Sequence, residues 1–78
     1  MNTNEVEAVV LEILGKVLKS EVSRKSARSN MLQWDSLKHI EFVFALEDKL
    51  ALQFTEEEVI VMDSVDRAVD CVMTRYAA

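Results

Sequence analysis

The sequence of 78 residues contains no proline, one glycine and one cysteine, and each scarcity argues against a class of structure. Turn-rich β folds depend on proline and glycine at their turns, so this composition favours helices. The lone Cys71 has no partner for an internal disulfide, and the chain therefore does not require an oxidising compartment. Neither Cys71 nor the single histidine, His39, stands in a C-x-x-C or H-x-x-x-H spacing, so no metal site is predicted.

Long apolar runs and a basic amino-terminal segment are also lacking. The first residues, Met1 to Glu5, have neither the positive charge nor the apolar stretch of a secretory signal. No segment reaches the about 20 apolar residues that a transmembrane helix needs. The sequence therefore predicts a cytoplasmic protein without a membrane span.

The length of the chain allows one hydrophobic core. A chain of this size buries only about 60% of the surface that it exposes when unfolded. Half of the residues are hydrophobic, which is sufficient for one core but not for two. We therefore expect a single domain that covers residues 1–78.

The net charge of −5 is unevenly distributed. Residues 34–70 contain ten acids and three bases, whereas residues 1–33 and 71–78 each carry a net charge of +1. An acidic surface repels the phosphate backbone of nucleic acids and suits partners that present basic patches. Nucleic acid is therefore not an expected partner.

Hydrophobic periodicity and capping residues predict four helices. Apolar residues recur every three or four positions from Glu5 to about Lys19, with Asn4 as the N-cap. The segment 20–30 has four serines and three bases, and we expect it to be a long loop. A second helix is predicted over Ser36–Leu50, after Asp35 as its N-cap.

The capping box Thr55-Glu56-Glu57-Glu58 predicts a short third helix, and Asp63 or Ser64 begins a fourth. The fold class is therefore all-α: a small four-helix bundle with three longer helices, one short helix and a long loop between the first and the second. The expected core is formed by the inward stripes of these helices and one loop residue: Val6, Val10, Ile13, Val17, Leu32, Phe42, Val43, Leu46, Leu50, Val59, Ile60, Val65, Val69 and Val72.

The start of the second predicted helix has the composition of an attachment site. Asp35 is a good N-cap because its carboxylate accepts a bond from a free backbone N–H group of the first turn. Ser36 then becomes the first helical residue. A phosphate joined to the hydroxyl of Ser36 would lie against the positive end of the helix dipole.

A second apolar stripe runs along the helix from the same serine. Ile40 and Phe44 follow Ser36 at steps of four and so share its face, with Glu41, Glu47 and Asp48 at the border of the stripe. An acidic rim around an apolar face is typical of a docking surface, whereas an isolated apolar pair often belongs to the core. Both interpretations of Ile40 and Phe44 stay open at this point.

Several of these residues together resemble the acyl carrier protein family. The similarity is carried by Asp35-Ser36-Leu37, the pair Ile40 and Glu41, the run Ala45-Leu46-Glu47 and the segment 59–69. The resemblance implies that a separate phosphopantetheinyl transferase attaches a 4′-phosphopantetheine arm from coenzyme A to Ser36. The thiol of that arm, rather than Cys71, would hold acyl groups as thioesters.

The same resemblance implies that partner enzymes bind the surface of the second helix. The recognition residues would be Asp35, Leu37, Ile40, Glu41, Phe44, Glu47 and Asp48. The partners implied are the transferase and enzymes with basic patches that load, condense or transfer acyl groups. The chain would act as a monomer and would not be an enzyme itself.

Some positions differ from the pattern of carriers in fatty acid biosynthesis. Lys38 stands where an acid is common, Gln33-Trp34 replaces a pair of small residues, and the loop 20–30 is basic. These differences favour a specialised pathway that makes a polyketide or other secondary metabolite, a modified lipid or a surface polymer. An apolar cleft between the second and third helices is a further hypothesis, because it would shelter an acyl chain.

Two other functions are alternatives to the carrier hypothesis. An unmodified helical adaptor would dock a partner helix through the Ile40/Phe44 face, and its function would survive the substitution Ser36→Ala. A hydrolase that uses Ser36, His39 and Asp35 is disfavoured, because all three residues crowd one helical turn and no G-x-S-x-G motif is present.

Overall fold

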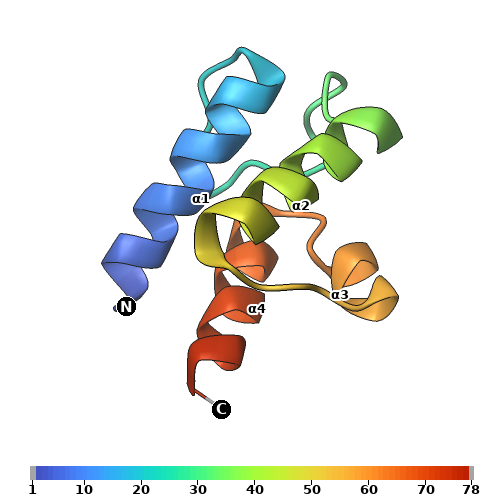
Figure 1. The fold of residues 1–78 in the computed structure, drawn as a ribbon. Coiled ribbons are helices and arrows are strands. Elements are labelled where there is room, and N and C mark those ends of the chain that lie inside the picture. Colours follow the sequence, from blue (N-terminus) through green and yellow to red (C-terminus); the bar gives the residue numbers. More distant parts are fainter. Residues whose placement is uncertain (1, 78) are drawn as a thin grey trace.

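The computed structural model describes residues 2–77 and contains four helices (Figure 1). They are α1 (Thr3–Leu18), α2 (Ser36–Leu50), α3 (Glu56–Val61) and α4 (Val65–Ala77). α1 packs against both α2 and α4, while the short α3 lies to one side and contacts α4. The predicted all-α bundle of three longer helices and one short helix is confirmed. Within the described residues, no helix has both the length and the apolar character needed to cross a membrane.

The first helix begins earlier than predicted. Asn2, not Asn4, is the N-cap: its side-chain oxygen accepts a bond from the backbone N–H of Glu5 at 2.8 Å. The Glu5 carboxylate in turn accepts a bond from the N–H of Asn2 at 3.0 Å, which completes a capping box. Both asparagines are followed by a glutamate three residues later, so spacing alone did not distinguish them. The prediction of Asn4 was wrong because the helix uses the earlier of two equivalent caps.

The other helix starts follow the predicted caps. The carboxylate of Asp35 accepts a bond from the backbone N–H of Lys38 at 2.9 Å, and α2 begins at Ser36. Thr55 caps α3 in the same way, and Glu58 closes a second capping box. At the start of α4, the hydroxyl of Ser64 accepts a bond from the N–H of a residue in the first turn at 3.1 Å. Local capping chemistry therefore sets all four starts, three of them at the predicted caps.

The core lies where α1, α2 and α4 meet, and most predicted core residues are buried there. Val17 and Val59 are only partly buried. Two predictions were wrong: the side chain of Leu32 is 100% exposed and that of Ile60 is 74% exposed. Leu32 lies in a turn closed by a bond from the N–H of Trp34, and Trp34 enters the core instead.

Ile60 is exposed because the six residues of α3 present only part of their circumference to the bundle. Met62, which directly follows α3, is buried in its place. The expected core also omitted other buried residues that fill the interior: Leu14, Leu18, Trp34, His39, Met62 and Ala68. Leu14, Leu18 and Ala68 widen the inward faces of the long helices α1 and α4, whereas Trp34 and Met62 lie in short connections where no repeat marks the inward side.

The segment between α1 and α2 crosses the bundle and pairs with the linker between α3 and α4. Ala27 and Ser64 form an antiparallel bridge. The N–H of Arg28 donates to the carbonyl of Asp63 at 2.9 Å, and the N–H of Val65 donates to the carbonyl of Ser26 at 3.0 Å. These backbone bonds fix the position of the crossing segment before it reaches Trp34 and the start of α2.

Candidate functional site

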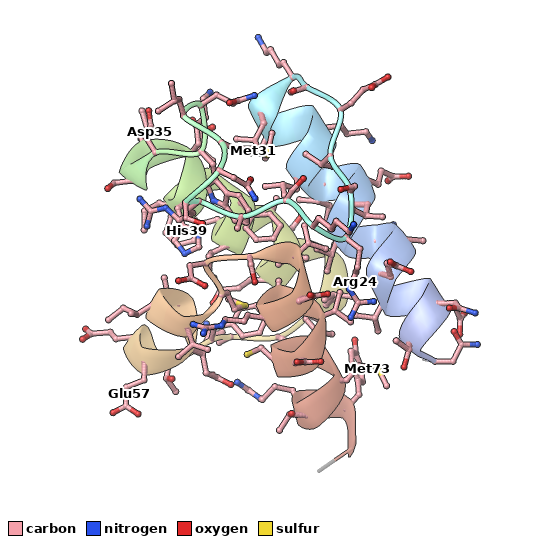
Figure 2. All side chains as sticks on the ribbon, turned by 180° about the vertical axis from the view of Figure 1, so that it is seen from behind. Arg24, Met31, Asp35, His39, Glu57 and Met73 are labelled. Atoms are coloured by element: carbon pink, nitrogen blue, oxygen red, sulfur yellow. The ribbon has the colours of Figure 1, made fainter. Side chains whose placement is uncertain are left out.

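The hydroxyl of Ser36 lies at the amino-terminal end of α2. Ser36 is exposed and is the first residue of the helix, directly after the N-cap Asp35. Figure 2 shows Asp35 at the outer edge of the molecule. His39, one turn further along α2, lies nearer to the interior of the molecule. The structure therefore presents the Ser36 hydroxyl to solvent at the positive end of a helix dipole.

Arg28 from the crossing segment reaches the same hydroxyl. Its Nε donates to the carbonyl of Trp34 at 3.3 Å, and its terminal NH2 donates to the Oγ of Ser36 at 3.4 Å. Sequence reasoning did not identify Arg28, because nothing in the spacing of a base eight residues before a serine indicates contact. Its position depends on the bridge between Ala27 and Ser64, which only the folded chain creates.

Below the surface, Trp34 and His39 form a buried polar pair. The indole Nε1 of Trp34 donates to the Nδ1 of His39 at 3.1 Å, and the Nε2 of His39 lies 2.7 Å from the carbonyl oxygen of Val59. An indole N–H only donates, so Nδ1 must accept and the proton of the neutral ring must lie on Nε2. Both nitrogens of His39 are thus engaged, and neither is free to take a proton from Ser36. His39 has a structural role under the site.

The apolar residues on the exposed side of α2 do not belong to the core. Leu37 is 67% exposed, Ile40 is 43% exposed and Phe44 is 64% exposed. Of the two interpretations of Ile40 and Phe44, the structure therefore excludes burial in the core. Three large apolar side chains remain available to a partner on the helix that begins at Ser36.

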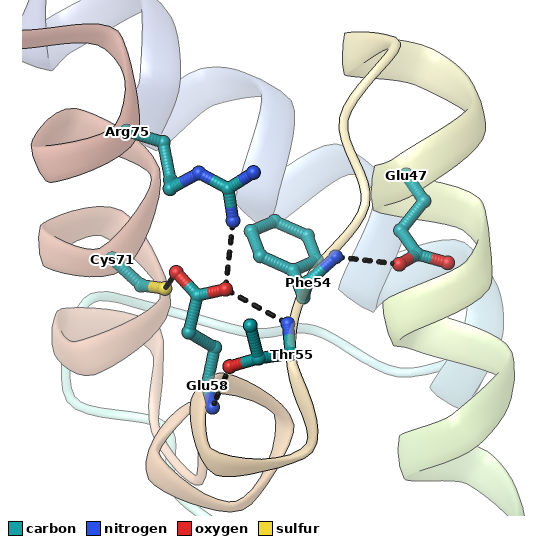
Figure 3. A network of polar contacts seen from close by, with 6 residues as sticks. All are labelled: Glu47, Phe54, Thr55, Glu58, Cys71 and Arg75. Carbon is teal, nitrogen blue, oxygen red and sulfur yellow. Dashed lines mark hydrogen bonds and ion pairs between the residues drawn. The ribbon is translucent and has the colours of Figure 1, made fainter. Parts of the chain in front are cut away.

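The three acidic residues predicted to border this surface have different surroundings. Glu41 and Asp48 are exposed, and Glu41 forms an ion pair with Lys38 at 3.3 Å. The carboxylate of Glu47 instead accepts a bond from the backbone N–H of Phe54 at 2.8 Å (Figure 3). Glu47 thus holds the connection between α2 and α3, in addition to its place on the predicted surface.

A second polar network joins α3 to α4 and surrounds the only cysteine (Figure 3). One carboxylate oxygen of Glu58 accepts bonds from the Thr55 N–H at 2.8 Å and from Arg75 at 2.7 Å. The Thr55 N–H and then Arg75 lower the pKa of Glu58. The other oxygen lies 3.6 Å from the Cys71 sulfur. Burial, and then the charge of Glu58, raise the pKa of Cys71 to about 11, so its thiol stays protonated at neutral pH.

A cleft lies between α3 and α4, next to this network. Its walls include Glu57, Val61, Arg67 and Asp70. The hypothesis from the sequence placed an apolar cleft between the second and third helices. The observed cleft lies instead between α3 and α4, so it is not the predicted cleft for an acyl chain.

No protein-family model matches this sequence. The resemblance to acyl carrier proteins therefore stays a hypothesis, and the function is inferred from the geometry around Ser36. That geometry comprises an exposed hydroxyl, an acidic N-cap, a nearby guanidinium and an apolar helix face.

Proposed function

We propose that this chain is a stand-alone acyl carrier protein, with a 4′-phosphopantetheine arm attached to Ser36. The exposure of the Ser36 hydroxyl at the first position of α2 is the observation that most supports this proposal. A modifying enzyme can reach an oxygen at that position. A phosphate on it would be stabilised by the helix dipole and by free N–H groups of the first turn.

In this proposal the chain carries substrates and catalyses nothing itself. The thiol of the arm binds acyl groups as thioesters and delivers them to separate enzymes. Coenzyme A supplies the arm, and a phosphopantetheinyl transferase attaches it. The carrier works as a cytoplasmic monomer in a specialised pathway for a secondary metabolite, a lipid or a surface polymer.

The exposed face of α2 supplies the docking surface of the carrier. Leu37, Ile40 and Phe44 offer apolar contact area, and Glu41 and Asp48 add negative charge at its border. Peripheral charges speed the encounter with a basic partner more than they strengthen the final complex. This balance suits a protein that must bind several enzymes in turn and leave each of them.

A second candidate function is a helical adaptor that is never modified. The exposure of Leu37, Ile40 and Phe44 favours it as much as it favours the carrier, because a partner helix needs such a face. The two functions differ in the role of Ser36. The adaptor does not need the hydroxyl, whereas the carrier loses all function without it.

Intact-mass measurement tests the carrier proposal directly. The protein is incubated with coenzyme A and a phosphopantetheinyl transferase of broad specificity, and we expect a gain of one arm per chain. Ser36→Ala should show no gain. Ser29→Ala removes an exposed serine from the crossing segment and should be modified like the wild type. A wild-type protein without any gain of mass would contradict the proposal and favour the adaptor.

A further inference from the structure

Arg28 differs from the other arginines because its side chain forms hydrogen bonds but no ion pair among the described residues. Among residues 2–77, ion pairs join Arg24 to Asp66 and Glu7, Arg67 to Asp63, and Arg75 to Glu58. None of the ion pairs in that part of the chain includes Arg28, whose side chain donates to the neutral oxygens of Trp34 and Ser36. A partly buried cation without an anion is unfavourable, and the adjacent positive end of α2 makes it more so.

The backbone holds this guanidinium in place. The N–H of Arg28 donates to the Asp63 carbonyl, and Ala27 pairs with Ser64, so the residue is tied to the linker between α3 and α4. The bond from Nε to the Trp34 carbonyl orients the planar group, and one terminal nitrogen then meets the Ser36 oxygen. The chain thus directs one terminal nitrogen of the guanidinium at the candidate attachment point.

We infer that Arg28 is a positioning residue that binds the phosphoryl group joined to Ser36, during transfer of the arm and afterwards. The inference rests on the proposed function. An arginine donates in a fork that matches two phosphate oxygens, and such charge-assisted bonds are about twice as strong as neutral ones. The guanidinium of Arg28, at the amino-terminal end of α2, would form an ion pair with the phosphate of the arm once the arm is attached.

The transfer step shows how Arg28 contributes. The Oγ of Ser36 forms a bond to the β-phosphorus of coenzyme A, while the bond from that phosphorus to the bridging oxygen breaks. The electron pair leaves with adenosine 3′,5′-bisphosphate, and the hydroxyl proton passes to a base of the transferase. Because a guanidinium only donates, the Ser36 Oγ accepts from Arg28 and its own proton stays available for donation to that base.

Rates of arm transfer test this role with matched variants. Arg28→Gln should lower kcat/KM for transfer to the carrier by about tenfold, because a charge-assisted bond to the phosphoryl group is lost. Arg28→Lys restores the charge without the fork and should recover part of the rate. Lys25→Gln removes the same charge from an exposed position in the same segment and should leave kcat/KM unchanged.

Spectroscopic measurements on the wild-type protein and on the same variants separate positioning from folding. The 15Nε resonance of Arg28 should shift when the arm is attached, and the 31P resonance of the loaded protein should move in Arg28→Gln but not in Lys25→Gln. Equal transfer rates with unmoved resonances would overturn the role of Arg28 and leave the carrier function standing. A wild-type chain that accepts no arm would overturn the carrier function itself.

Discussion

Cys71 and the thiol of the proposed arm are two sulfhydryl groups with different reactivity. Burial and the nearby Glu58 raise the pKa of Cys71 to about 11. Only the thiolate is a good nucleophile, and at pH 8 roughly one Cys71 in a thousand would be deprotonated. An arm attached to the exposed Ser36 would extend from the surface, so its thiol should react first.

Alkylation at pH 8 distinguishes the two thiols. We expect iodoacetamide to label the arm of the loaded protein and to leave Cys71 largely unmodified, with its labelling rate rising as the pH approaches 11. Peptide mass spectrometry locates the label. Glu58→Gln removes the neighbouring negative charge and should speed the labelling of Cys71 at a given pH. If Cys71 of the folded wild type reacted as fast as a free cysteine peptide, the protecting effect of its surroundings would be refuted.

At the scale of residues, the sequence allowed prediction where the chemistry is local. The cap at Asp35 and the position of Ser36 depend on adjacent residues, and both were predicted correctly. The contact of Arg28 with Ser36 depends on pairing with residues far along the chain, and no local pattern indicates it. The functional roles of these residues stay predictions until modification is measured.

Among the elements, the short α3 is joined to α2 through the buried ring of His39. The last four carbonyls of a helix lack partners within it, and the carbonyl of Val59 in α3 lies 2.7 Å from the Nε2 of His39. The same ring accepts the Trp34 N–H at 3.1 Å. His39 therefore satisfies two buried polar groups from two other parts of the chain.

His39→Ala should lower the free energy of unfolding by about 2–4 kcal/mol, because it leaves a cavity and an unpaired buried indole N–H. Trp34 is the only tryptophan, so its fluorescence during urea unfolding reports the change. Lys38→Ala alters an exposed ion pair on the preceding residue and should cost less than about 1 kcal/mol. Equal effects of the two substitutions would show that the buried pair adds no stability.

The starts of α2 and α3 were predictable because each begins with a strong capping sequence. The choice of inward faces was less predictable in short segments. Leu32 in a turn and Ile60 in the six-residue α3 were both expected in the core and are exposed. A long helix shows its inward stripe by repetition, whereas a single turn does not.

At the scale of the whole molecule, charge is separated between regions. Residues 34–70 contain ten acids and three bases, while the crossing segment at 20–30 contains three bases and one acid. A field of this kind attracts a basic partner toward the acidic part of the molecule, which comprises α2, α3 and the start of α4. The proposed encounter with the transferase should therefore depend on salt.

The double variant Glu41→Lys/Asp48→Lys should slow arm transfer by about tenfold at low ionic strength, because steering toward α2 is reversed. The deficit should shrink near 0.5 M salt, where the Debye length falls well below about 10 Å. Glu12→Lys/Asp70→Lys changes the net charge equally on α1 and α4 and should have a smaller effect. If both double variants slowed transfer alike, recognition would depend on total charge instead of on α2.

The bridge between Ala27 and Ser64 also determines where the chain tolerates a change of length. The polypeptide is anchored at this bridge and again at the N-cap Asp35, so residues 28–34 form a spacer of fixed reach. An inserted residue within the spacer would carry the guanidinium out of register with the hydroxyl. An insertion beside the exposed Glu21, ahead of the bridge, would leave both anchors where they are.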